Sequence, residues 1–118
     1  MKKPTTLELG KLAAKIADDK KGRDIVLLNV KRVTPIADYF LIVTADSNPQ
    51  MRAIIDSIEQ EFRERGLQNP VHRDGQTSSS SWAVLDYGGI IIHVMMPAAR
   101  EFYALEKIWS EARKVKVE

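Results

Sequence analysis

Two side chains that could act as an acid–base pair, Asp86 and His93, stand in a stretch that predicts a hairpin of two strands. If Gly88-Gly89 forms a two-residue turn, which glycine favours because it tolerates positive φ, both side chains fall on the same face. Such a pair needs a nucleophile to carry out covalent catalysis. The chain has no cysteine, and the serines at 78–81 lie in a polar loop without a nucleophile-elbow motif. A hydrogen-bonded structural or interface pair is therefore favoured over catalysis.

Metal and nucleotide chemistry have little support among the other residues. The two histidines, His72 and His93, do not have the spacing of a zinc site, and no GxGxxG or P-loop pattern is present. Nucleotidyl transfer uses two or more metal-binding carboxylates at close spacing, whereas the loop after residues 39–44 offers only Asp46. We expect no catalytic residue, cofactor or metal. A nucleotidyltransferase-like enzyme that uses Asp46 and Asp86 is the first alternative.

The composition is typical of one soluble domain spanning residues 1–118. The 118 residues are 44% hydrophobic and 29% charged, and no apolar run is long enough to cross a bilayer. The amino-terminal sequence MKKPTTLELGKLAAK has no apolar signal core, so we expect a cytoplasmic protein. The net charge of +2 is too balanced for a protein held mainly by nucleic-acid phosphates. Nucleic-acid contact is therefore expected only at the periphery.

Hydrophobic periodicity predicts a mixed sheet with helices packed on it, an α/β or α+β layer fold. Three helices are expected, over 7–17, from Pro49 to Gly66 and from about 98 to 114, with Phe102, Leu105, Trp109 and Ala112 on the inner stripe of the last. Strands are expected over 24–30, 39–44, 70–73 and in the final hairpin. The unit across 39–73 predicts a parallel crossover.

The hairpin has two unlike faces. One is apolar apart from one hydroxyl and belongs on the core: Ala83, Leu85, Tyr87, Ile90, Ile92 and Val94. The other mixes aromatic, aliphatic, carboxylate and imidazole groups: Trp82, Val84, Asp86, Ile91, His93 and Met95. Such a mixture is typical of an interface centre, so we expect this face to turn outward and bind a macromolecule. A second layer buried under another helix is the close alternative, and a homodimer that buries the same face is a further one.

Two signatures resemble those of the ribosomal silencing factor (RsfS, or Iojap) family. The first is DYFLIVT at 38–44, followed by a short polar loop and Gln50. The second runs through WAVLDYG at 82–88, IHV at 92–94, REFY at 100–103 and LEKIW at 105–109. Together they cover residues from about 7 to 112 in the order and spacing of the family, and the combination is highly specific.

The resemblance implies a nucleotidyltransferase-like fold that lacks the catalytic carboxylates. It implies binding to the large ribosomal subunit through the fourteenth large-subunit ribosomal protein (uL14 type). The bound factor would block association with the small subunit, repress translation and take part in large-subunit maturation. The contacting surface of the family includes the tryptophan that is Trp82 here, with Asp86 and Tyr87 beside it. The expected partner-binding residues are Trp82, Val84, Asp86, Tyr87, Ile91, His93, Met95, Arg100 and Tyr103.

Overall fold

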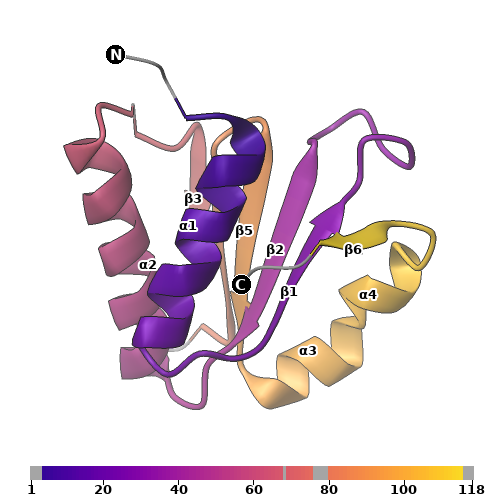
Figure 1. Cartoon of the computed structure of the whole chain (residues 1–118). Coiled ribbons are helices and arrows are strands. Elements are labelled where there is room, and N and C mark those ends of the chain that lie inside the picture. The colour runs from indigo at the N-terminus through magenta and orange to yellow at the C-terminus, as the bar shows by residue number, and fades with distance from the viewer. Residues whose placement is uncertain (1–3, 68, 76–79, 116–118) are drawn as a thin grey trace.

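A six-stranded mixed sheet separates helices on its two sides in the computed structural model, which describes residues 4–67, 69–75 and 80–115 (Figure 1). The helices are α1 (Thr6–Asp19), α2 (Asn48–Glu64), α3 (Pro97–Tyr103) and α4 (Leu105–Ile108). The strands are β1 (Arg23–Asn29), β2 (Tyr39–Thr44), β3 (His72–Asp74), β4 (Trp82–Asp86), β5 (Ile90–Met95) and β6 (Arg113–Val115), in the order β3-β4-β5-β2-β1-β6. The predicted mixed α+β class is confirmed. Within the described ranges, no helix has the length and apolar character needed to span a membrane.

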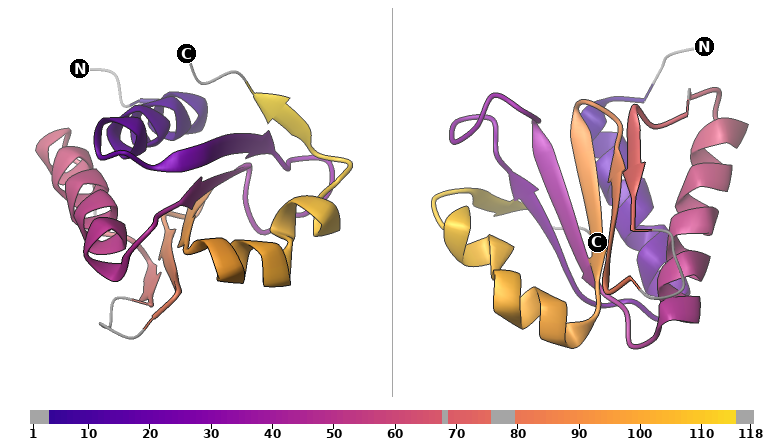
Figure 2. Two further views of the ribbon diagram at one scale, coloured as in Figure 1. Left: turned by 90° about the horizontal axis from the view of Figure 1, so that it is seen from below. Right: turned by 180° about the vertical axis from the view of Figure 1, so that it is seen from behind.

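The two central strands, β2 and β5, are parallel and buried along their whole length. Near-continuous apolar sequence is typical of strands covered on both faces. The chain leaves β2 for α2 on one face and leaves β5 for α3 on the other (Figure 2). The short strand after α2 runs in the same direction as β2, as predicted. That strand, β3, lies at the far edge, however, with β4 and β5 between it and β2.

Local sequence signals account for the two longer helices. Thr5 and Glu8 form a capping box at the start of α1, with both reciprocal hydrogen bonds present. At the start of α2 the Ser47 side chain accepts a hydrogen bond from the amide of Gln50. Apolar residues at helical spacing on α2 are buried against the sheet, namely Met51, Ile54, Ile55, Ile58 and Phe62. The sequence prediction of this helix is confirmed.

The last segment differs from the continuous helix predicted over residues 98–114. It breaks at Ala104, where φ is +46° and ψ is 51°, and then forms α4 and the short strand β6. The Arg100 side chain spans the break: Nε donates to Glu106 Oε1 at 3.0 Å, and Nη1 donates to Thr44 Oγ1 at 2.8 Å. The strand β6 then pairs with β1 and satisfies part of its open edge.

The break also changes which side chains face inward. Leu105, Trp109 and Ala112 pack against the sheet as predicted. Phe102 was predicted to lie on the inner stripe, but it is 81% exposed. The prediction fails because α3 ends at Tyr103, directly after Phe102, and no long helical stripe forms. The side of α3 that faces the sheet is instead the side that carries Ala99 and Arg100.

Replacing Ala104 with glycine tests the break. A side chain at positive φ costs about 1–2 kcal/mol, and glycine avoids this cost while losing about 0.5–1 kcal/mol of chain entropy. Ala104→Gly is therefore expected to raise the free energy of unfolding by about 0.5–1 kcal/mol in urea denaturation. Ala99→Gly is the control, because Ala99 lies within α3 and its replacement should destabilise. A loss of stability in Ala104→Gly would mean that the helix continues through this position.

Candidate partner-binding surface

The β4–β5 hairpin has the register that the sequence predicted. Leu85 lies opposite Ile92 and Val84 lies opposite His93, and the Tyr87 amide donates to the Ile90 carbonyl at 2.9 Å. The apolar face of the hairpin packs in the main core below α1 and α2. The mixed face points to the opposite side of the sheet, where α3 and α4 lie.

The mixed face is divided between buried and partly open residues. On β5, Ile91, His93 and Met95 are all buried and pack in the cluster that contains Phe40 and Ala99. The expectation that the whole face turns outward is wrong for these three residues, because α3, α4 and the residues after them cover β5 and β2. Here the alternative of a second buried layer is confirmed. The β4 residues of the same face, Trp82, Val84 and Asp86, lie at the edge of this cover and are half-buried.

Three aromatic rings meet at the border of this cover. The centroid of the Tyr103 ring lies 4.6 Å from that of Trp82, and the Phe102 ring stands nearly perpendicular to Tyr103 at 5.0 Å. Tyr103 is 45% exposed, and Phe102 is the most exposed large hydrophobic side chain among the described residues. We call Trp82, Phe102 and Tyr103 the aromatic surface. The sequence analysis missed Phe102, although two adjacent aromatics on one short helix cannot both face inward, since neighbours are 100° apart.

A partly buried hydrogen bond fixes the orientation of Trp82. Its indole Nε1 donates to His93 Nδ1 at 3.1 Å, and the His93 ring meets the Phe40 ring edge-on at 5.3 Å. Burial lowers the pKa of His93 to about 4, an effect that the charge of Asp86 opposes. The imidazole is therefore neutral near pH 7. Its accepting Nδ1 places the proton on Nε2, which has no hydrogen-bond partner among the described residues.

Asp86 and His93 do not form the hydrogen-bonded pair that the sequence favoured. Asp86 Oδ1 instead accepts the amide of Gly88 at 2.8 Å and stabilises the hairpin turn, where Gly88 has a φ of +86°. His93 is bonded to Trp82. Each side chain thus has a separate structural task, and the arrangement offers no acid–base dyad.

Two further candidates lie apart from the aromatic surface. Tyr87 is on the opposite face of the hairpin, 4.8 Å from the Phe62 ring, and desolvation together with the charge of Glu59 raises its pKa to about 12. The side chain of Arg100 is only 12% exposed and is held by Glu106 and Thr44. The structure therefore gives both residues a packing role, and the aromatic surface is composed of other side chains.

The two carboxylates of the enzyme alternative lie at opposite ends of the sheet. Asp86 lies opposite Ile91, whereas Asp46 follows Ala45, whose amide bonds to the Met95 carbonyl. Four residues of extended β5 separate these positions, about 13 Å. Asp46 is ion-paired with Arg23, whose hydrogen bonds lower the pKa of this carboxyl. The two cannot share one metal ion, and the described part of the chain contains no cluster of three metal-binding side chains.

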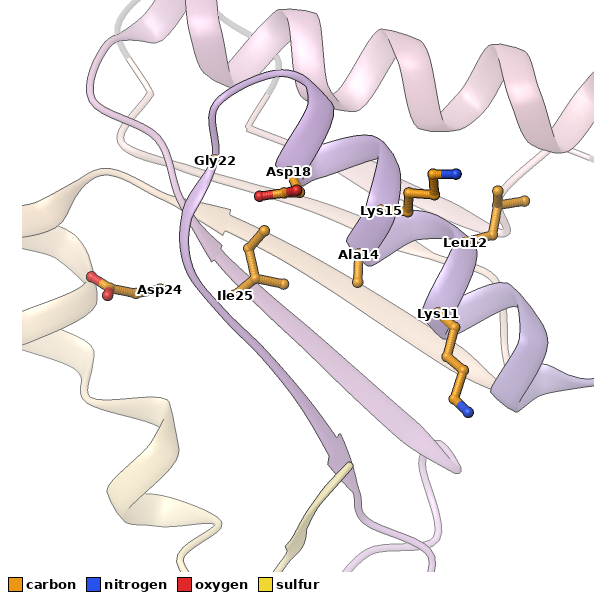
Figure 3. A pocket seen from close by; sticks show the side chains of 8 residues that line it. All are labelled: Lys11, Leu12, Ala14, Lys15, Asp18, Gly22, Asp24 and Ile25. Atoms are coloured by element: carbon orange, nitrogen blue, oxygen red, sulfur yellow. The ribbon is translucent and has the colours of Figure 1, made fainter. Parts of the chain in front are cut away.

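A cavity of about 680 Å³ lies between α1 and β1, on the other side of the sheet from the aromatic surface (Figure 3). Its charged side chains are Lys11, Lys15, Asp18 and Asp24, and its apolar lining includes Leu12 and Ile25. None of the predicted site residues lies in it. The candidate site of this protein is therefore the aromatic surface and not this cavity.

Comparison with known proteins decides the family. The family model described as "Ribosomal silencing factor during starvation" matches residues 3–118. The chain belongs to this family. Its members are regulatory proteins of the ribosome and not enzymes, as the sequence analysis expected. The family match covers both the aromatic surface and the sheet that supports it.

Individual family members agree with this assignment. The ribosomal silencing factor of Halalkalibacterium halodurans is 35% identical over 94% of this chain and 93% of its own length. A crystal structure of a Chromobacterium violaceum protein superposes with a TM-score of 0.85 at 32% identity, covering 96% of this chain and 92% of that one. A mouse protein named for mitochondrial assembly of the ribosomal large subunit is 27% identical over 77% of this chain and 40% of its own length.

The buried His93 predicts a pH dependence of stability. The unfolded chain takes up a proton near pH 6.5, whereas the folded chain does so only near pH 4, so stability is full above pH 6.5 and falls between these values. The contribution of His93 to this loss is at most about 3 kcal/mol. In urea denaturation at stepped pH, His93→Gln is expected to flatten the curve over this range. The exposed His72 is the control, and a His72→Gln variant that flattens the curve equally would contradict the assignment.

Proposed function

We propose that the chain binds the large ribosomal subunit through its fourteenth ribosomal protein and thereby prevents the small subunit from joining. Family membership supports the ribosome as the target, and the sequence signatures support the fourteenth protein as the contact. The observation that carries the proposal is the aromatic surface, in which the Tyr103 ring contacts both Trp82 and Phe102 and the rings of Phe102 and Tyr103 are exposed to solvent. Tyrosine and tryptophan dominate the energetics of many protein interfaces.

The geometry of the aromatic surface suits docking without rearrangement. Trp82 is held by His93 on one side and by Tyr103 on the other, so little side-chain freedom is lost on binding. Half-buried Asp86 and Val84 extend the surface along β4, and exposed Glu101 adds charge beside Phe102. An apolar centre with a polar rim is the usual anatomy of a protein interface.

Steric exclusion follows from the size of the protein. A body of 39 × 32 × 26 Å seated on the subunit interface occupies space that the small subunit needs. Translation then falls because fewer complete ribosomes form. Binding at the same position on an unfinished large subunit would give the protein a role in large-subunit maturation. The name of the mouse relative, which refers to assembly of the large subunit, agrees with this role. We place this action in the cytoplasm.

The first test is sedimentation with purified subunits. The chain is expected to comigrate with the large subunit and not with the small one, and its addition is expected to lower the fraction of assembled ribosomes. Phe102→Ala and Tyr103→Ala should each weaken binding by about 2 kcal/mol, roughly thirtyfold. Because Phe102 is so exposed, its loss should change the free energy of unfolding by less than about 0.5 kcal/mol.

Val71→Ala is the matched control, since Val71 is 69% exposed but lies outside the aromatic surface. It is expected to bind like the parent chain. Comigration with the small subunit alone would refute the proposal. Light scattering addresses the homodimer alternative: a dimer that survives addition of the large subunit, and that Phe102→Ala disrupts, would assign the aromatic surface to self-association.

A further inference from the structure

Three basic side chains, two of them adjacent in the loop between β1 and β2 and the third distant in sequence, meet at one pocket. Lys31 and Arg32 belong to this loop, and Arg113 opens β6, where it pairs with Asn29 at the end of β1. Together with Asn29, Val33 and Glu111 they line a pocket of about 470 Å³. We call Lys31, Arg32 and Arg113 the basic patch. The pairing of β6 with β1 creates it, and a continuous last helix would not.

The balance of charge distinguishes this pocket from its counterparts elsewhere on the described chain. It has three cations and a single carboxylate, Glu111. The cavity between α1 and β1 has two lysines and two aspartates, and the pocket beside α3 has three cations facing three carboxylates. The small net charge of the protein is therefore unevenly distributed, and the basic patch carries a local excess that sequence composition conceals.

The basic patch is exposed, and hydrogen bonds hold the backbone of the loop that carries it. Lys31, Arg32 and Arg113 are exposed, and within the described residues none of them forms an ion pair with a carboxylate. The loop backbone is fixed, since the Val30 amide bonds to the Asp38 carbonyl at 2.9 Å and the Lys31 amide bonds to Asn29 Oδ1 at 3.1 Å. An anion bound here would therefore order little additional chain.

We propose that the basic patch binds the phosphate backbone of ribosomal RNA while the aromatic surface binds ribosomal protein. The proposal rests on the proposed function, because it assumes that the chain sits on the large subunit. A ribosome presents protein and uniformly anionic RNA, and a preformed excess of cations complements the RNA. Arginine guanidinium groups bind phosphate oxygens in bidentate fashion, and Arg32 and Arg113 supply two such groups at one pocket.

The position of the basic patch allows both contacts at once. The α3–α4 segment starts beside β4, which carries Trp82, and leads to β6, which carries Arg113 (Figure 2). The aromatic surface thus includes the end of α3, and the basic patch includes the start of β6 after α4, within a molecule whose longest dimension is 39 Å. A partner as large as a ribosomal subunit can span this distance.

The test compares affinity for the intact large subunit with affinity for the isolated fourteenth ribosomal protein. Arg32→Gln/Arg113→Gln is expected to lose on the order of tenfold in affinity for the subunit and nothing for the isolated protein. Each lost phosphate contact should lower the slope of log affinity against log salt by about one. The matched control is Lys11→Gln/Lys15→Gln, which removes two charges from the α1–β1 cavity and should leave both affinities unchanged.

Three other outcomes would contradict the inference. Equal losses toward the subunit and the isolated protein would make the basic patch a protein contact. An unchanged salt slope, or an equal loss in the α1 control, would show that no local phosphate contact exists. Phe102→Ala separates this inference from the proposed function, because it should weaken binding to both targets. If Phe102→Ala has no effect while the basic patch variant loses subunit affinity, the aromatic docking fails and the RNA contact stands.

Discussion

The parallel pairing of β2 with β5 is the constraint on which the rest of the structure depends. Both strands are mostly apolar and are buried on both faces, so each face of the sheet needs its own cover. The helices α1 and α2 supply one cover as regular amphipathic helices. The second cover is shorter and broken, and it leaves the β4 side chains on this face only half-buried. The candidate site lies at the edge of this second cover, where it leaves β4 partly exposed.

Arg100 shows how one side chain makes a broken cover stable. Its guanidinium bonds to Thr44 at the end of β2 and to Glu106 beyond the break, so three elements meet at one nearly buried charge. Charge-assisted hydrogen bonds of this kind are about twice as strong as neutral ones. The bend follows Phe102 and Tyr103, which lie at the end of α3, and it returns the chain to β1 as β6. One local arrangement therefore sets the position of the aromatic surface and brings Arg113 to the β1–β2 loop.

The buried face and the open face are linked through aromatic contacts. Rings follow one another from Phe102 through Tyr103, Trp82 and His93 to Phe40, with centroid separations between 4.6 and 5.8 Å. The neutral His93 accepts the indole N–H, which leaves Trp82 anchored while one side remains open. This arrangement explains why a histidine occurs in a core strand: it satisfies the only polar atom of a tryptophan that must lie at a boundary.

Sequence alone determined the elements whose signals are local. Capping residues and helical spacing specified α1 and α2, and the glycine turn specified the hairpin register and its two faces. Tertiary structure decided what covers each face, because that depends on contacts between distant segments. The break at Ala104 has no local signal as strong as glycine or proline, and β6 forms because the edge of β1 needs partners. These contacts between distant segments decide which side chains are buried or exposed, and residue periodicity does not encode them. They account for the exposure of Phe102, the burial of Ile91 and Met95, and the place of Arg113 beside Arg32.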